Sequence, residues 1–229
     1  MEQYRFHSDG ALFYVTFSVV DWLPIFVSEA ACKIVSESLN FCHRQKGLRT
    51  NTYVIMLTHL HAVLFHADFQ AKALEQVVTD FRKFTGRRLA DFCAEHMPAC
   101  FQTVLAERAG GDRERRLWQP TRHPVQIETE GFWQTKIDYL HHNPLRKGLV
   151  RAAEHWRFSS ASYWATGGKI ESDVLLRTCN LLTSLFRGDG TVVPCGEFFV
   201  EDNPHRLFIV FRSFLAGGVV AVQKMNGSG

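Results

Sequence analysis

The first part of the chain alternates between apolar runs of strand length and longer segments with helical periodicity. Ala11 to Val20 is almost entirely apolar and rich in aromatic and β-branched residues, which predicts a strand that is buried on both faces. After Ser28, apolar positions recur at helical spacing as far as Gly47. We therefore expect a helix that Ser28 caps and Gly47 ends.

The pattern continues with, in chain order, strands at 51–57 and 60–66, a helix over 71–94, a short strand at 125–127 and a helix over 130–140. The first two of these strands join near Thr58 as a hairpin. Asn143-Pro144 closes the last helix, because Pro144 cannot donate the next backbone hydrogen bond. The order predicts an α+β fold, in which a ferredoxin-like antiparallel sheet carries helices on one face and the first and third strands are central.

Composition supports a folded, cytoplasmic protein. The chain has 229 residues, of which 46% are apolar, so it can fill a core, and disorder throughout is excluded. Its six cysteines form no CxxC pair and its N-terminus has no signal-peptide core, which indicates a reduced compartment. The longest apolar stretch, Leu207 to Val222, is too short to cross a bilayer comfortably. We expect one domain over 1–165 and a C-terminal extension of unknown role over 166–229.

Positive charge is concentrated in the middle of the chain. The net charge is only +3, but residues 82–157 hold fourteen Lys and Arg against nine Asp and Glu. Arginine predominates among these cations, and its planar guanidinium suits phosphate, although a solvated basic surface explains the charge equally well. The candidate nucleic-acid contacts are Arg82, Lys83, Arg87, Arg88, Arg122, Lys136 and Arg146. Trp118 joins them as a base-stacking platform, with a core role as the alternative, and Trp133 is a second stacking candidate.

Two short spacings carry the candidate chemistry. His59 and His61 point to one face if their segment is a strand, and Tyr139 and Asn143 stack on one face if theirs is a helix. Two imidazole nitrogens and an amide oxygen can hold one divalent metal beside a tyrosine hydroxyl. Taken singly, each pair has an alternative role in packing.

An ordered set of segments resembles a known family. The segments are Tyr4-Arg5, Tyr14-Val15-Thr16-Phe17, Met56 to His61, Trp118-Gln119, Ile137-Asp138-Tyr139-Leu140, Asn143-Pro144, Gly148-Leu149-Val150 and Trp156-Arg157-Phe158-Ser159-Ser160. They occur in the order found in REP-associated tyrosine transposases, relatives of the single-strand insertion-sequence transposases of the HUH class. The resemblance covers roughly Tyr4 to Trp164.

The resemblance implies a single-tyrosine HUH nuclease fold. It makes His59 and His61 paired metal ligands, Asn143 the third ligand and Tyr139 the nucleophile, with hairpin DNA flanked by single strands as the substrate. The family usually has Met-Pro-Asn before the first histidine, whereas this chain has Met56-Leu57-Thr58. The orientation of His59 is therefore left open.

The leading functional expectation is nicking and strand transfer of single-stranded DNA through a 5′-phosphotyrosine, with magnesium or manganese (Mg²⁺ or Mn²⁺) as cofactor. One alternative is a catalytically decayed nucleic-acid-binding protein on the same fold. Another is a metal-dependent phosphohydrolase that uses water. A homodimer stays open, as does the question of whether Tyr139 acts beside the metal of its own chain or a partner's.

Overall fold

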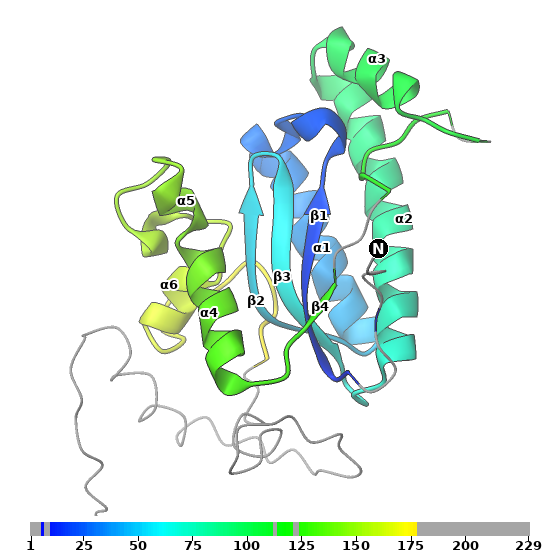
Figure 1. Ribbon diagram of the computed structural model, residues 1–229. Helices are drawn as coiled ribbons and strands as arrows, with labels where there is room; N and C mark the ends of the chain where they lie inside the picture. The colour runs from blue at the N-terminus through cyan, green and yellow to red at the C-terminus, as the bar shows by residue number, and fades with distance from the viewer. Residues whose placement is uncertain (1–5, 7–9, 112–113, 121–123, 178–229) are drawn as a thin grey trace, which may run out of the picture.

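The computed structural model describes residues 6, 10–111, 114–120 and 124–177. Its sheet has four antiparallel strands in the spatial order β2-β3-β1-β4. In chain order these are β1 (Leu12–Ser18), β2 (Leu48–Met56), β3 (His59–His66) and β4 (Val125–Gln126), as Figure 1 shows. The first and third strands are central, so the predicted ferredoxin-like α+β fold is confirmed.

Two long helices, α1 (Glu29–Gln45) and α2 (Ala71–His96), cover one face of the sheet (Figure 1). Gly47 ends α1 as predicted, because its φ of +70° lies in the left-handed region that glycine adopts without a steric penalty. Ser28 occupies the N-cap position, but its side chain makes no capping hydrogen bond. The start of α1 is therefore fixed by packing and not by the expected cap.

The core between the sheet and these two helices is apolar. β1 contributes Phe13, Val15 and Phe17, which follow the two-residue alternation of a strand. β3 contributes Leu60 and Leu64, and all five side chains are buried. Burying an aliphatic or aromatic side chain of this size contributes about 1.5–3 kcal/mol.

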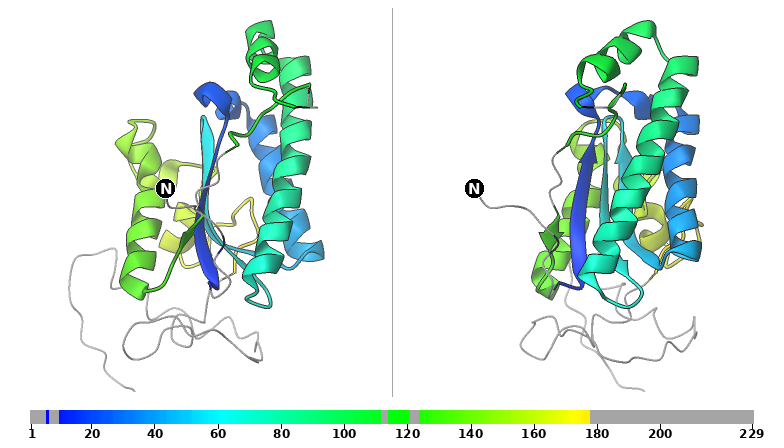
Figure 2. Two further views of the ribbon diagram at one scale, coloured as in Figure 1. Left: turned by 45° about the vertical axis from the view of Figure 1, so that its right-hand side comes forward. Right: turned by 90° about the vertical axis from the view of Figure 1, so that its right-hand side faces the viewer.

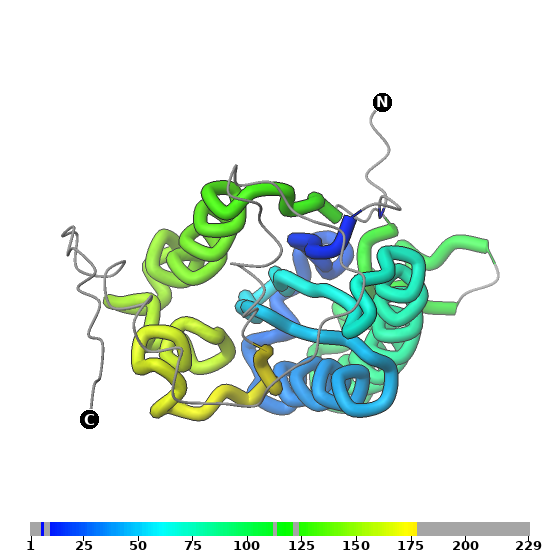
Figure 3. Tube along the Cα trace, turned by 90° about the horizontal axis from the view of Figure 1, so that it is seen from below, coloured from blue at the N-terminus to red at the C-terminus, as the bar shows by residue number. Residues whose placement is uncertain are grey.

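The opposite face of the sheet carries α4 (Glu130–His141), followed by the short helices α5 (Asn143–Arg146) and α6 (Ala161–Ala165). Figures 2 and 3 show the sheet between this layer and the layer of α1 and α2. The expectation of helices on one face thus holds for α1 and α2 only. α4 lies on the other face because Trp133, Ile137 and Leu140 pack there against the even-numbered side chains of β1.

Several short elements were not predicted from the pattern. They are α3 (Ala99–Glu107) and three 3-10 turns, η1 (Val20–Trp22), η2 (Ile25–Val27) and η3 (Ala153–His155). α2 ends at His96, and Pro98 caps the start of α3, which changes the chain direction there. Turns of this length bury too few side chains to leave a periodic signal in the sequence.

The chain beyond α6 runs back along β2. Leu176 pairs with Thr50 in a parallel bridge, and the backbone N–H of Arg177 donates to the Thr50 carbonyl at 2.9 Å. Val174 is buried in the main core. The extension at 166–229, with its apolar stretch at 207–222, lies mostly outside the described residues, so its boundary stays a prediction. Among the helices that are described, none is long and apolar enough to span a membrane.

Candidate active site

The two histidines of β3 lie side by side on the face that α4 covers. Their rings are 4.6 Å apart and nearly perpendicular, with an interplanar angle of 74°. The alternation of the strand sets this arrangement, since residues i and i+2 point the same way. His61 is buried and His59, next to the hairpin turn, is half-buried. The predicted convergence of the two imidazoles is confirmed.

Hydroxyl groups contact the same nitrogen on each ring. The Oγ1 of Thr58 lies 2.9 Å from Nδ1 of His59. Tyr14 Oη and Thr16 Oγ1 each lie 2.8 Å from Nδ1 of His61. If Nδ1 carries the proton and donates to these oxygens, the Nε2 lone pair of each ring remains for a ligand. Thr58, which replaces the residue usual in the family, therefore orients His59.

Tyr14 and Thr16 were not identified as site residues from the sequence. Thr16 is directly opposite His61 in the pairing of β1 with β3, and Tyr14 is the next residue on the same face. Burial raises the pKa of Tyr14, so its phenol stays neutral and can accept the bond from His61. The signals in the sequence are the alternation of β1 and the place of Tyr14-Val15-Thr16-Phe17 among the segments of the resemblance. The register that brings both hydroxyls to His61 is a tertiary feature.

Burial keeps both imidazoles neutral. It lowers the pKa of His59 to about 4, with a smaller contribution from the charge of Lys147. It lowers the pKa of His61 to about 3, with smaller contributions from His59 and Lys136. A neutral imidazole is the form that binds a metal ion, so the pair is ready for coordination near neutral pH.

Tyr139 of α4 faces this pair within the same chain. Its ring lies 5.9 Å from the ring of His61, and its side chain is 46% exposed. The guanidinium of Arg146 lies 4.5 Å from the Tyr139 ring centroid and also donates to the Tyr139 carbonyl. The phenol is therefore both near the histidines and open to a ligand that arrives from solvent.

Asn143 is one helical turn beyond Tyr139, at the first residue of α5. Its side chain is buried, and its Nδ2 has no hydrogen-bond partner among the described residues. An unpaired buried amide costs about 1–3 kcal/mol. Rotation of the amide exchanges its nitrogen and oxygen, so an oxygen can occupy the unpartnered position.

These observations fit a divalent metal. In the tautomer that carries the proton on Nδ1, the two neutral imidazoles offer Nε2, and with the amide of Asn143 they form a donor set of two nitrogens and one oxygen. Within the described residues, no group of three or more His, Cys, Asp or Glu gathers to hold a metal. A metal here depends on Asn143 and on oxygens from water or phosphate, and such a site has modest affinity without its substrate.

Positive side chains surround the site. Lys136 of α4 places its Nζ 5.1 Å from the Tyr14 ring centroid. Arg146 lies against Tyr139, and the charge of Lys147 is felt by His59. Lys136 and Arg146 were among the predicted phosphate contacts. The charge of Lys136 is felt by His61, and Arg146 lies against Tyr139. Lys147 was not among the phosphate contacts predicted from the sequence.

The segment after η3 fixes α4 against the sheet. The indole N–H of Trp156 donates to the Ile55 carbonyl at 2.8 Å, and the Tyr53 N–H donates to the Ser160 hydroxyl at 3.0 Å. The same hydroxyl lies 2.9 Å from Nε2 of His141. These bonds join β2, residues 156–160 and the end of α4. Trp156 and Ser160, which belong to one of the segments of the sequence resemblance, therefore have a structural role.

The structure corrects the predicted base-stacking platform. Trp118 is buried between Phe17 and Phe26, and its indole N–H donates to Thr85 at 3.0 Å. Trp133 is also buried, in the core under α4. Both are core residues with no surface on which an unpaired base could stack.

The remaining predicted cations lie on α2, on the side of the sheet opposite the histidines. Arg82 is half-buried, donates to the Gln119 carbonyl and lies 5.6 Å from the Phe17 ring, so it has a structural role. Lys83, Arg87 and Arg88 are exposed on the outer surface of the helix. Arg122 lies outside the described residues.

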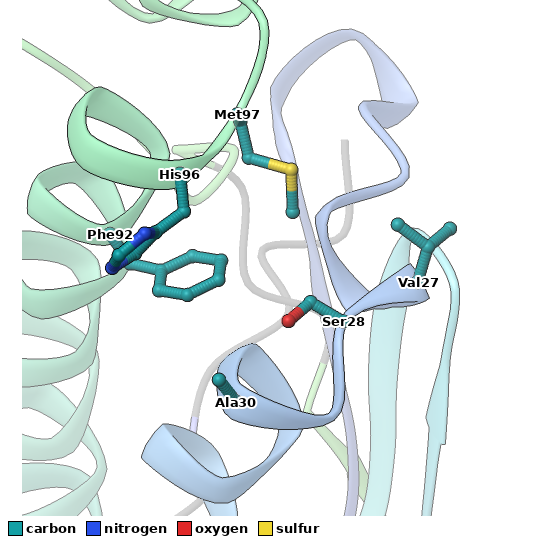
Figure 4. A pocket seen from close by; sticks show the side chains of 6 residues that line it. All are labelled: Val27, Ser28, Ala30, Phe92, His96 and Met97. Carbon is teal, nitrogen blue, oxygen red and sulfur yellow. The ribbon is translucent and has the colours of Figure 1, made fainter.

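A hollow of about 400 Å³ lies elsewhere on the described surface. It lies between the start of α1 and the end of α2, as Figure 4 shows, and is lined by Val27, Ser28, Ala30, Phe92, His96 and Met97. None of the site residues lines this pocket. At the candidate active site, between β3 and α4, Tyr139 is exposed while His61 and Asn143 are buried.

Comparisons with known proteins bear on the fold. No family model matches the chain, and no curated protein matches it. A solved structure of a REP-associated tyrosine transposase bound to a REP hairpin matches with a TM-score of 0.51 and 16% identity, over 88% of this chain and all of that one. At this identity the match shows the fold alone. The described part of the chain thus has an HUH transposase-like fold.

Proposed function

We propose that the protein nicks single-stranded DNA and transfers the strand through a covalent phosphotyrosine at Tyr139. The observation that carries the proposal is the position of the Tyr139 ring, 5.9 Å from His61 and exposed to solvent. A tyrosine that served only packing would have no reason to lie exposed beside two neutral imidazoles and an unpaired buried amide.

His59, His61 and Asn143 would hold the divalent cation, magnesium or manganese. When bound, such an ion neutralises charge that develops on the phosphate oxygens. The Nδ1 contacts from Thr58, Tyr14 and Thr16 hold each Nε2 in place for it.

Tyr139 supplies the nucleophile. Its Oη forms a bond to the scissile phosphorus while the bond from phosphorus to the 3′ oxygen breaks. The phenolic proton is lost and the 3′ oxygen leaves as a hydroxyl. The new ester between Tyr139 and the 5′ phosphate conserves the energy of the phosphodiester, so the reverse attack by a 3′-hydroxyl rejoins a strand without a nucleotide triphosphate.

Lys136, Arg146 and Lys147 would bind the DNA backbone on either side of the scissile phosphate. Such contacts release counterions, so binding should weaken as salt is raised. The solved neighbour is bound to a REP hairpin, and we propose hairpin DNA with single-stranded flanks as the substrate class. Because Tyr139 and the histidines meet within one chain, a single subunit can supply the whole site, and the homodimer stays a prediction.

The test is the formation of a covalent adduct. The protein is incubated with manganese and end-labelled hairpin DNAs that carry single-stranded flanks, and the products are separated on a denaturing gel. Wild-type protein should yield a labelled protein–DNA species, and Tyr139→Phe should yield none while it still binds the DNA. Tyr163→Phe, which removes only the hydroxyl group of a half-buried tyrosine in α6, is the matched control and should behave as wild type.

Other outcomes identify the two alternatives. Binding without cleavage of any hairpin, in wild type and variants alike, would assign the chain to catalytically inactive DNA-binding proteins. Free 5′-phosphate ends without a protein adduct, retained in Tyr139→Phe, would indicate a phosphohydrolase in which water is the nucleophile. Either result overturns the proposal.

A further inference from the structure

We propose that Trp22 stacks on the unpaired base next to the phosphate held at His59 and His61. This inference rests on the proposed function, since it assigns the base-binding element of the same site. It replaces Trp118 and Trp133, whose rings are buried in the core.

Trp22 is the most exposed tryptophan among the described residues. Its side chain is 56% exposed, although it lies in η1, the turn that follows β1, where Val20 is buried in the core. An indole left in water forgoes a large gain from burial. A base has two flat apolar faces and binds exposed aromatic rings in single-stranded DNA complexes.

The backbone that places Trp22 in this exposed position adopts an unfavourable conformation. Asp21 and Trp22 have φ values of 48° and 55°, in the left-handed region that side chains other than glycine and asparagine rarely adopt. The turn is nevertheless fixed at both ends. The Val20 N–H donates to the Leu117 carbonyl at 2.8 Å, and the Asp21 carboxylate accepts from Arg108 at 2.8 Å. The indole is therefore presented by a braced turn and not by a loose loop.

The position of the ring links it to the site. Its centroid is 5.9 Å from that of His59, and the two planes are nearly perpendicular at 87°. Only a single sugar separates a base from its phosphate. A phosphate bound through the cation that His59, His61 and Asn143 would hold thus places a neighbouring base within reach of Trp22, and the charge of Lys147 is felt at His59.

Stacking of this kind does not read the base sequence. A planar indole accepts any base, and its energy comes from contact between π-faces. Trp22 should therefore orient the strand at the scissile position and add affinity. Sequence selection must come from other contacts.

The test compares two probes with the same backbone charge. One is a labelled dT strand of about 12 nucleotides and the other is an abasic strand of the same length, both with Mn²⁺ and in the Tyr139→Phe background so that nothing is cleaved. Trp22→Leu should weaken binding of the dT strand by roughly 5- to 100-fold and leave binding of the abasic strand unchanged. Trp22→Phe keeps an aromatic face and should retain most of the affinity.

Phe84→Leu is the matched control. Phe84 is also exposed, at 57%, but it lies on the outer surface of α2. Its replacement should change binding of neither probe. Circular dichroism melting of each variant establishes that it is folded.

Three results would overturn the inference. An equal loss for both probes in Trp22→Leu would show that the indole supports the fold of the site and not a base. Unchanged binding of dT would show that it is not used. A change from dimer to monomer on light scattering would show that Trp22 contacts a second copy. Absence of binding to either probe by the Tyr139→Phe parent would overturn the inference as well, whereas the proposed function is refuted only by the adduct test.

Discussion

The two faces of the sheet use alternate residues of the same strands for opposite purposes. The face under α1 and α2 takes Phe13, Val15 and Phe17 from β1 and is filled by apolar side chains. The face under α4 takes Tyr14 and Thr16 from the same strand, and it places hydroxyl groups against His61. Both faces bury apolar side chains, and the face under α4 adds the polar groups of the candidate site.

The difference shows why register matters in this fold. A shift of one residue between β1 and β3 would turn Thr16 away from His61 and direct the imidazole into the apolar core. The large core on the first face fixes the register, and the register in turn positions the polar site on the second face. The site therefore needs little stabilising contact of its own.

The largest expected contrast is between Leu60 and Tyr139. Leu60→Ala empties a fully buried position and should lower the free energy of unfolding by about 2–5 kcal/mol. Tyr139→Phe alters an exposed side chain and should change it by less than about 0.5 kcal/mol. Urea denaturation measures both. A similar loss in both variants would show that the two faces are not divided in this way.

The next contrast uses two buried tyrosines on opposite faces. Tyr14→Phe removes a hydroxyl 2.8 Å from His61, and Tyr53→Phe removes one 3.2 Å from Ser172. Loss of a group that orients a metal ligand typically costs 10–100-fold in metal affinity, so Tyr14→Phe should weaken Mn²⁺ binding by about that factor. Tyr53→Phe should leave it unchanged. Calorimetric titration with Mn²⁺ provides the comparison, and equal affinities in the two variants would remove Tyr14 from the site.

Acid should destabilise the fold through histidines on both faces. Burial, and then the charge of Arg49, lower the pKa of His43 to about 4, whereas an unfolded histidine titrates near 6.5. Between these values the unfolded chain binds a proton that the folded chain does not, so stability falls as the pH is lowered from about 6.5 towards 4.

His43→Gln isolates the contribution of the α1 face to this loss of stability at acid pH. It should flatten the dependence of the unfolding free energy on pH by up to about one proton in that window. The contributions of His59 and His61 to the pH dependence of the unfolding free energy remain in this variant. An unaltered slope would mean that His43 is already protonated in the folded protein.

The smallest expected effect concerns salt. Arg146→Gln removes a cation from the site and should reduce the slope of log affinity against log salt by about 0.7 for a short single strand. Arg87→Gln removes a cation from the opposite side of the sheet. A strand that is too short to reach around the domain should bind this variant with the same salt dependence as wild type. Fluorescence anisotropy at several salt concentrations separates the two. The reverse ranking would place the DNA path along α2.

Long periodic segments were predictable from the sequence, and tertiary relationships were not. The helices α1, α2 and α4 and the β2–β3 hairpin lie close to their predicted bounds, because each carries many turns or alternations of apolar residues. The shared direction of His59 and His61 follows from the strand alone. The hydroxyls of Tyr14 and Thr16 required the pairing of β1 with β3, which joins residues more than forty positions apart.

Tryptophan illustrates the same limit. Trp118 follows a basic run and was a reasonable stacking candidate, yet it is buried against Phe26. Trp22 lies next to a buried strand and was not considered, yet it is exposed beside His59. Burial depends on how distant segments meet, and the local composition around either residue does not encode it.

The most direct test of the central claim is to map the site of covalent attachment. The protein–DNA species formed with manganese is digested with nuclease and protease, and the peptides are analysed by mass spectrometry. The account predicts a nucleotide joined through its 5′ phosphate to the phenolic oxygen of Tyr139. Attachment to any other residue, or cleaved DNA with no modified peptide, would contradict it.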